Sequence, residues 1–127
     1  MLAMDRTLSL TVKDSLFDPD SSDRVAQFRR LPDGKTEYNV CIYVDGADLP
    51  FVEEIVYDLH ETFSPRTRRV SRSLANPRCK LNIRTWGIFT IRATITTKFG
   101  NQLTLSHPLQ YGREISSPPP GAIFQPS

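Results

Sequence analysis

The chain of 127 residues is poor in the residue types from which most catalytic and metal sites are built. It has two histidines, His60 and His107, and two cysteines, Cys41 and Cys79. Neither histidine stands at metal-ligand spacing from a cysteine or a second histidine, and two cysteines make no disulfide framework. No glycine-rich phosphate loop and no nucleophile motif occurs. We therefore expect no catalytic residue, no metal and no cofactor, and so not an enzyme.

Long apolar runs are also missing. No stretch approaches the roughly 20 apolar residues that cross a bilayer, and residues 1–6 lack the apolar core of a signal peptide. The sequence therefore predicts a protein without membrane insertion, in the cytoplasm or, in a eukaryotic host, in the nucleus.

Acidic residues are absent from much of the second half. Residues 1–61 hold 13 acidic and 6 basic side chains, whereas residues 62–113 hold 10 basic side chains and no acidic one. Such asymmetry is typical of proteins with an acidic partner. In a fold that brings both halves together, the same charges can instead neutralise one another. Both interpretations stay open on the sequence alone.

What the sequence has in plenty is alternation of apolar and polar residues, the pattern of half-buried strands. Many of the apolar positions are β-branched or aromatic, which favours strands. The runs lie at 8–12, 38–44, 55–59, 81–83, 89–95 and 103–105. Residues 25–30 and 36–44 flank the turn sequence Leu31-Pro32-Asp33-Gly34-Lys35, which predicts a hairpin. We expect an all-β fold, an antiparallel immunoglobulin-like β-sandwich of seven or eight strands.

The domain prediction is a single sandwich over residues 1–115. Two segments are predicted to stay unpacked. Residues 18–23 form an acidic, polar loop, and residues 116–127, with Pro118-Pro119-Pro120, form an extended proline-rich tail.

Two short motifs point to a known family. Leu59-His60-Glu61-Thr62-Phe63 closes one alternating run, and Trp86-Gly87-Ile88-Phe89 opens another. Together with Ile42–Gly46, Arg69-Val70 and Leu105–Leu109, they make residues 38–111 resemble a YEATS domain. That resemblance implies an immunoglobulin-like sandwich that reads acylated lysines, chiefly on histone tails in eukaryotic members.

The resemblance also implies a binding site. Phe63 and Trp86 would be the two walls of an aromatic slot for a flat acyl amide. The Thr62 hydroxyl and the Trp86 backbone N–H would bond that amide, His60 would orient Thr62, and Phe89 would support the Trp86 loop. The expected ligand-binding set is His60, Thr62, Phe63, Thr85, Trp86 and Gly87. The expected partner is an acylated-lysine peptide or protein, and the candidates for flanking contacts are Arg66, Arg68, Arg69 and Arg72.

The sequence departs from the histone readers in ways that matter for the ligand. Thr85 stands where those readers usually carry glycine, and residues 71–76 lack their usual proline pair. These features resemble the prokaryotic YEATS-like branch. Two alternatives are an interaction or signalling domain whose basic segment 64–84 contacts an acidic partner, and nucleic-acid binding through that same segment. Trp86 as a plain core residue is the structural alternative to a slot wall.

Overall fold

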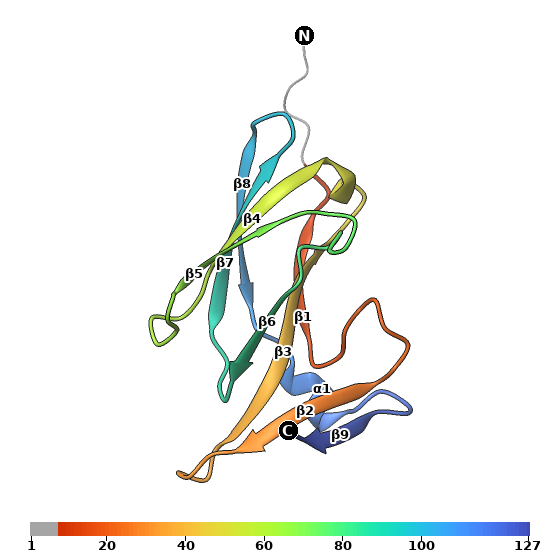
Figure 1. Ribbon diagram of the computed structural model, residues 1–127, viewed down its shortest axis with the longest axis vertical. Helices are drawn as coiled ribbons and strands as arrows, with labels where there is room; N and C mark the ends of the chain where they lie inside the picture. The colour runs from red at the N-terminus through yellow and green to blue at the C-terminus, as the bar shows by residue number, and fades with distance from the viewer. Residues whose placement is uncertain (1–7) are drawn as a thin grey trace.

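Two β-sheets packed face to face form the molecule in the computed structural model, which describes residues 8–127 (Figure 1). The first sheet contains β1 (Thr11–Ser15), β2 (Val25–Arg30), β3 (Thr36–Asp45), β6 (Leu81–Thr85) and β9 (Ile123–Pro126). The second sheet has the order β5-β4-β7-β8, from β4 (Val52–Asp58), β5 (Thr67–Ser71), β7 (Thr90–Thr97) and β8 (Gln102–Pro108). Two short helices, η1 (Leu49–Phe51) and α1 (Gly112–Ser116), complete the described chain. The predicted immunoglobulin-like sandwich is confirmed, with nine strands in the described residues rather than seven or eight.

The long strand β3 organises the first sheet. Its second half pairs with β1 and its first half with β2, both antiparallel, and its middle pairs with β6. Alternate β3 side chains face inward, so that Val40, Ile42 and Val44 are fully buried. The predicted hairpin of residues 25–44 is therefore confirmed, and β6 places Thr85 opposite Tyr38.

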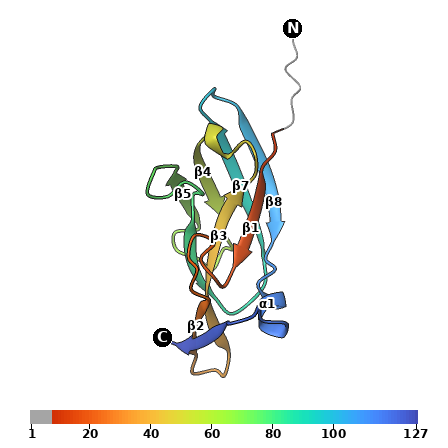
Figure 2. The ribbon, with the colours of Figure 1, turned by 90° about the vertical axis from the view of Figure 1, so that its right-hand side faces the viewer.

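The second sheet supplies the other half of the core. Ile55 and Tyr57 of β4 meet Ile91, Ala93 and Ile95 of β7 in one buried cluster. In Figure 2, strands β1 and β3 lie in front of β4 and β7, as expected for two stacked layers. The Tyr57 hydroxyl donates to the Cys79 carbonyl at 2.8 Å, and burial raises the pKa of that phenol. The alternation in the sequence is thus the alternation between core and surface.

The first strand starts later than expected. Alternation predicts a strand over residues 8–12, but β1 covers Thr11–Ser15. Residues 8–10 run instead beside the turn after β3, where the Ser9 N–H donates to the Asp48 carboxylate at 2.6 Å. A Cβ on Gly46 would overlap the Ser9 carbonyl, and Gly46 has a positive φ of 137°, so this close approach requires glycine.

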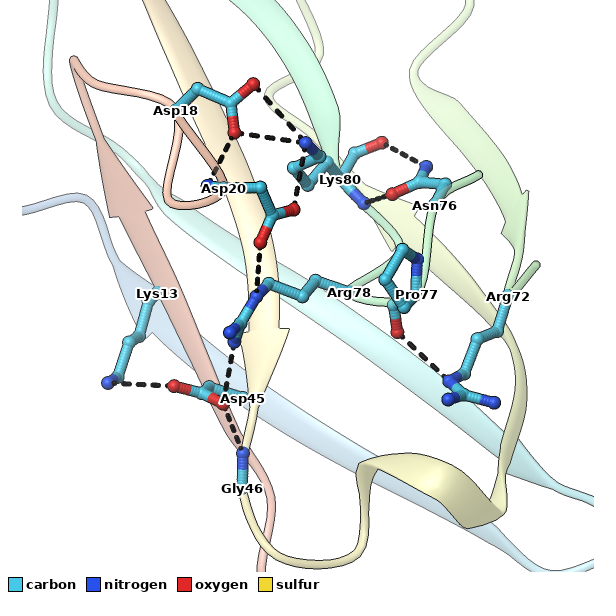
Figure 3. A network of polar contacts seen from close by, with 10 residues as sticks. All are labelled: Lys13, Asp18, Asp20, Asp45, Gly46, Arg72, Asn76, Pro77, Arg78 and Lys80. Carbon is cyan, nitrogen blue, oxygen red and sulfur yellow. Dashed lines mark hydrogen bonds and ion pairs between the residues drawn. The ribbon is translucent and has the colours of Figure 1, made fainter. Parts of the chain in front are cut away.

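The acidic loop is not unpacked as predicted. Lys80 Nζ lies 3.0 Å from Asp18 Oδ1 and 3.0 Å from Asp20 Oδ2, and Arg78 bridges Asp20 and Asp45 at 2.9 Å each (Figure 3). Residues more than 30 positions apart in the sequence therefore hold the loop against the β5–β6 connection. Composition could not reveal these partners because they are brought together only by the fold.

The C-terminal tail is extended but it is not unpacked. Residues 123–126 form β9, which pairs with β2 in parallel, an exception to the antiparallel pattern. The Phe124 ring packs edge-on against Phe17, with ring centroids 6.3 Å apart. Just before the tail, Glu114 of α1 accepts hydrogen bonds from the Leu16 N–H and the Ser15 hydroxyl, both at 2.7 Å. The tail thus supplies an edge strand that proline content alone did not predict.

No helix in residues 8–127 is both long enough and apolar enough to span a membrane.

Candidate ligand-binding groove

A groove of about 580 Å³ opens between the β4–β5 and β6–β7 connections. Both connections lie toward the lower left of the molecule in Figure 1, near the tip of the β2–β3 hairpin. All seven residues that the sequence singled out for ligand binding or support line this groove: His60, Thr62, Phe63, Thr85, Trp86, Gly87 and Phe89. The fold therefore brings together two motifs that are more than 20 residues apart in the sequence.

The β4–β5 connection is built on a buried anchor. Leu59 is 2% exposed, and its N–H donates to the Arg66 carbonyl at 2.8 Å, which closes the loop. Within the loop, the Phe63 N–H donates to the His60 carbonyl at 3.0 Å. The Ser64–Pro65 peptide bond is cis. Residues 60–63 therefore form a tight turn at the end of β4, beside the groove.

The β6–β7 connection is braced from within. The Thr85 hydroxyl accepts from the Gly87 N–H and donates to the Gly87 carbonyl, both at 3.2 Å. The Tyr111 hydroxyl donates to that same carbonyl at 2.8 Å. Burial raises the pKa of Tyr111 to about 12, so the phenol stays protonated as a donor. Thr85, where histone readers carry glycine, is 7% exposed and holds the turn that presents Trp86.

The aromatic side chains of the groove fall into two groups. Phe63 packs on Phe89 with ring centroids 5.4 Å apart, and His60 packs on Phe89 at 5.7 Å. Phe89 is partly buried against the core, so it supports both residues from below. Trp86 stands apart and is 56% exposed, which a core tryptophan would not be. On its ring lies Lys35 Nζ, 3.6 Å from the ring centroid.

The polar groups of the groove centre on His60 and Thr62. The Thr62 N–H donates to His60 Nδ1 at 3.2 Å, and Thr62 Oγ1 lies 2.9 Å from the same nitrogen. A nitrogen that accepts the backbone N–H carries a lone pair, so the Thr62 hydroxyl is placed to donate to it as well. The threonine oxygen then keeps its own lone pairs free to accept a hydrogen bond from a ligand.

Only one of the four arginines proposed for flanking contacts lines the groove. That residue is Arg68, whose Nε donates to the Pro65 carbonyl at 2.8 Å. Arg66 pairs with Asp58 at 3.1 Å and Arg69 with Glu54 at 2.6 Å, while Arg72 donates to the Pro77 carbonyl at 3.0 Å. These three stabilise β5 and its neighbouring loops rather than the groove.

Several groove residues were not found from the sequence. The lining also contains Glu37, Ser64, Arg84 and Ile88. Glu37 and Arg84 come from β3 and β6, whose pairing depends on the strand order of the sheet, which alternation does not give. Glu37 itself is paired with Arg29 at 2.8 Å.

Metal chemistry has no candidate site in the described part of the chain, because no three His, Cys, Asp or Glu side chains gather there as ligands. The groove instead presents aromatic faces, the hydroxyls of Thr62 and Ser64, and basic side chains. That combination suits a flat, neutral polar group that stacks and forms hydrogen bonds.

Solved structures share this fold. The Yaf9 YEATS domain recognising an H3K122suc peptide aligns with a TM-score of 0.53 at 16% identity, covering 89% of this chain and 82% of that one. Yaf9, described as the yeast AF-9 homolog, aligns with a TM-score of 0.53 at 20% identity, covering 84% and 70%. The Yaf9 YEATS domain bound to H3K27ac gives a TM-score of 0.50 at 16% identity, covering 85% and 78%. At these identities the likeness shows the fold alone.

Sequence comparison gives the family. No curated protein matches the chain. Residues 38–110, more than half of the chain, match the prokaryotic YEATS domain. That match includes both groove motifs and the strands that carry them, from β3 through β8. The chain belongs to the prokaryotic YEATS domain family.

Proposed function

We propose that this protein is a non-catalytic recognition module that binds an acylated lysine, or a similar flat amide, in the groove between Phe63 and Trp86. The observation that carries the proposal is the convergence of two separate motifs on one groove, with Trp86 more than half exposed. The Yaf9 YEATS domains that recognise H3K122suc and bind H3K27ac support the ligand class by their shared fold.

The chemistry of the groove favours a neutral ligand. Acylation removes the charge of lysine, so the side chain is far cheaper to desolvate than an ammonium group. Stacking on two rings contributes about 1–3 kcal/mol at typical aromatic-pair values. Two amide hydrogen bonds add about 1–3 kcal/mol at 0.5–1.5 each. These sums predict affinities in the range of about millimolar to micromolar.

Each polar group of the acyl amide has a partner in the proposed complex. The ligand N–H donates to Thr62 Oγ1, whose own hydrogen points to His60 Nδ1. The Trp86 backbone N–H donates to the acyl carbonyl. Thr85 and Tyr111 hold the turn that fixes this N–H, through their hydrogen bonds to Gly87.

An interaction domain without acyl-lysine reading is the second candidate, and the basic segment 64–84 is its sequence support. In the structure, several cations of this segment are already paired with carboxylates: Arg66, Arg69, Arg78 and Lys80. The segment therefore offers a smaller free basic surface than its sequence implies, which favours the groove as the binding site.

Tryptophan fluorescence tests the proposal directly, because Trp86 is the only tryptophan in the chain. Peptides carrying acetyl-, butyryl- or crotonyl-lysine are titrated against the same peptide with unmodified lysine. We expect a saturable change in emission with acylated peptides and none with the unmodified one. A flat response to every acylated peptide at millimolar concentration contradicts the proposal.

Variants separate a slot wall from a structural residue. Phe63→Ala and Trp86→Ala should each abolish peptide binding, measured by calorimetry, while the thermal unfolding midpoint stays close to wild type for Trp86→Ala. Phe99→Ala is the matched control, because Phe99 is an exposed aromatic, 73% accessible, that packs on Phe51 outside the groove. Unfolding of Trp86→Ala would mean that Trp86 is architecture rather than a slot wall.

A further inference from the structure

Basic side chains near the groove differ in whether a carboxylate neutralises them. Arg66 and Arg69 pair with Asp58 and Glu54. In contrast, the Arg84 side chain has no ion pair or hydrogen bond to any residue in 8–127. Arg68 donates to the Pro65 carbonyl but has no carboxylate partner in that same range. Both guanidinium groups that line the groove therefore lack a neutralising carboxylate among the described residues.

These two arginines line the groove from different sheets. Arg68 belongs to β5, which follows the loop of Phe63, and Arg84 belongs to β6, directly before Thr85 and Trp86. A ligand in the groove therefore meets one guanidinium group without a carboxylate partner from each sheet. An exposed arginine alone is ordinary, but two that line one groove from different sheets offer two separate contacts to one ligand.

The other charges beside the groove are paired. Glu37 is the one acidic residue that lines the groove within the described chain, and Arg29 already pairs with it. Lys35, outside the lining, places its ammonium group 3.6 Å from the centre of the Trp86 ring and 3.7 Å from Asp33 Oδ2. Arg68 and Arg84 are therefore the charged groups of the lining that are left for a ligand. Opposite charge attracts across such a rim and like charge is repelled.

We infer that the groove selects its amide from an acidic stretch of peptide, in which Asp or Glu residues on either side of the acylated lysine contact Arg68 and Arg84. The inference rests on the proposed function, since it concerns the residues that flank the side chain in the groove. Guanidinium groups suit carboxylates because their planar donors can bond both oxygens. A peptide with basic flanks meets the same two cations as repulsion.

The test uses three acetyl-lysine peptides of equal length, with acidic, neutral or basic residues flanking the modified lysine. Exposed ion pairs are weak, so we expect the acidic peptide to bind only about 3- to 10-fold more tightly than the basic one. Because exposed charges are screened, the preference should shrink as salt concentration rises. Unacylated peptides of the same three sequences set the background.

Charge reversal ties the preference to the named residues. Arg84→Glu should weaken the acidic peptide and strengthen the basic one, and Arg68→Gln should reduce the difference between them. Arg92→Glu is the matched control, because Arg92 is an exposed strand arginine outside the groove. It should leave the order of the three peptides unchanged, with thermal unfolding used to verify that each variant is folded.

The outcomes distinguish the inference from the function on which it rests. Equal binding of the three acetylated peptides rejects acidic flanks but leaves acyl-lysine reading intact. A gain that comes only from a succinyl group in the neutral peptide also overturns the inference, because the carboxylate would then belong to the acyl group. Displacement of the acidic peptide by a single-stranded oligonucleotide at lower concentration overturns it in favour of nucleic acid. Failure of every acylated peptide to bind rejects both.

Discussion

At the scale of single residues, the contact between Thr62 and His60 decides which hydrogen bonds the groove can offer. His60 Nδ1 accepts the Thr62 N–H, and Thr62 Oγ1 lies 2.9 Å from the same nitrogen. The hydroxyl hydrogen is then committed to His60, and the threonine oxygen acts toward a ligand as an acceptor only. The groove is thereby matched to a ligand N–H rather than to a second carbonyl.

This assignment predicts coupling between Thr62 and the ligand N–H. Thr62→Val should weaken acetyl-lysine binding by about 2- to 10-fold, at 0.5–1.5 kcal/mol for one hydrogen bond. An ester analogue that replaces the N–H by oxygen should lose a similar factor against wild type, but little more against Thr62→Val. Calorimetry of the four combinations measures the coupling. Thr62→Ser, which keeps the hydroxyl, is the control, and additive losses would contradict the assignment.

Lys35 is a second residue with a specific expected effect. Its ammonium group lies over the Trp86 ring but does not line the groove, so we infer that it covers the ring face turned away from the ligand. An exposed cation–π contact is worth about 0.5–1 kcal/mol, so Lys35→Met should weaken acylated-peptide binding by about 2- to 5-fold.

The same variant has a readout without ligand. Trp86 of Lys35→Met should become more accessible to a fluorescence quencher such as acrylamide, whereas Lys35→Arg should stay near wild type. Lys98→Met, which changes an exposed lysine outside the groove, is the matched control. Unchanged quenching in Lys35→Met would show that the ring is held by other contacts.

The groove residues also show what a sequence can predict about a site. The sequence predicts the lining residues of the two motifs apart from Ile88, because each motif is a continuous segment with aromatic and polar groups at a strand end. Arg84 and Glu37 were missed because they join the groove through the pairing of β3 with β6. Pairing partners depend on strand order and register, and periodicity within one strand carries no information on either.

At the scale of elements, the strands with clear alternation were predicted and the others were not. The hairpin of β2 and β3 had both alternation and a turn sequence, and it formed as expected. Strand β5 has few apolar side chains because it lies at the edge of its sheet. Strand β9 follows three consecutive prolines and contains a fourth, so composition favoured an unpaired tail. Its place beside β2 depends on tertiary contacts alone.

Strand β9 should therefore contribute measurable stability. Phe124 is partly buried and packs on Phe17, so Phe124→Ala should lower the free energy of unfolding by about 1–2 kcal/mol, less than a fully buried phenylalanine. Gln125→Ala, on the exposed side of the same strand, should cost little. Denaturant titration of both variants measures the difference. Equal stability of Phe124→Ala and wild type would show that the packing of Phe124 in β9 does not contribute to the free energy of unfolding.

At the scale of the whole molecule, part of the uneven charge of the sequence is neutralised in space. Basic residues of the second half pair with acidic residues of the first, most densely where Arg78 and Lys80 meet Asp18, Asp20 and Asp45 (Figure 3). The sequence posed this as one of two alternatives, and only the fold decides between them. Of the basic side chains without a carboxylate partner in residues 8–127, Arg68 and Arg84 are the two that line the groove.

The paired carboxylates predict how the stability of the molecule depends on pH. Lys80, by hydrogen bonding, holds the pKa of Asp20 below its ordinary value of 3.8, and backbone N–H groups of Asp20 and Gly46 do the same for Asp18 and Asp45. Because the folded-state pKa lies below the unfolded value, the ionised form stabilises the fold. This contribution is present above the unfolded value and is lost as pH falls through the folded one.

Asp20→Asn isolates one of these groups. Near neutral pH the variant should be less stable than wild type, by about 1 kcal/mol or less because the ion pairs of Asp20 are partly exposed. As pH falls below the ordinary value of 3.8 and then through the lowered folded-state pKa of Asp20, wild type loses this contribution, so the two stability curves should converge. Urea unfolding from about pH 7 to about pH 3 measures both. A constant difference in stability across this range would show that the charge of Asp20 is not its cause, because a protonated aspartic acid is as neutral as an asparagine.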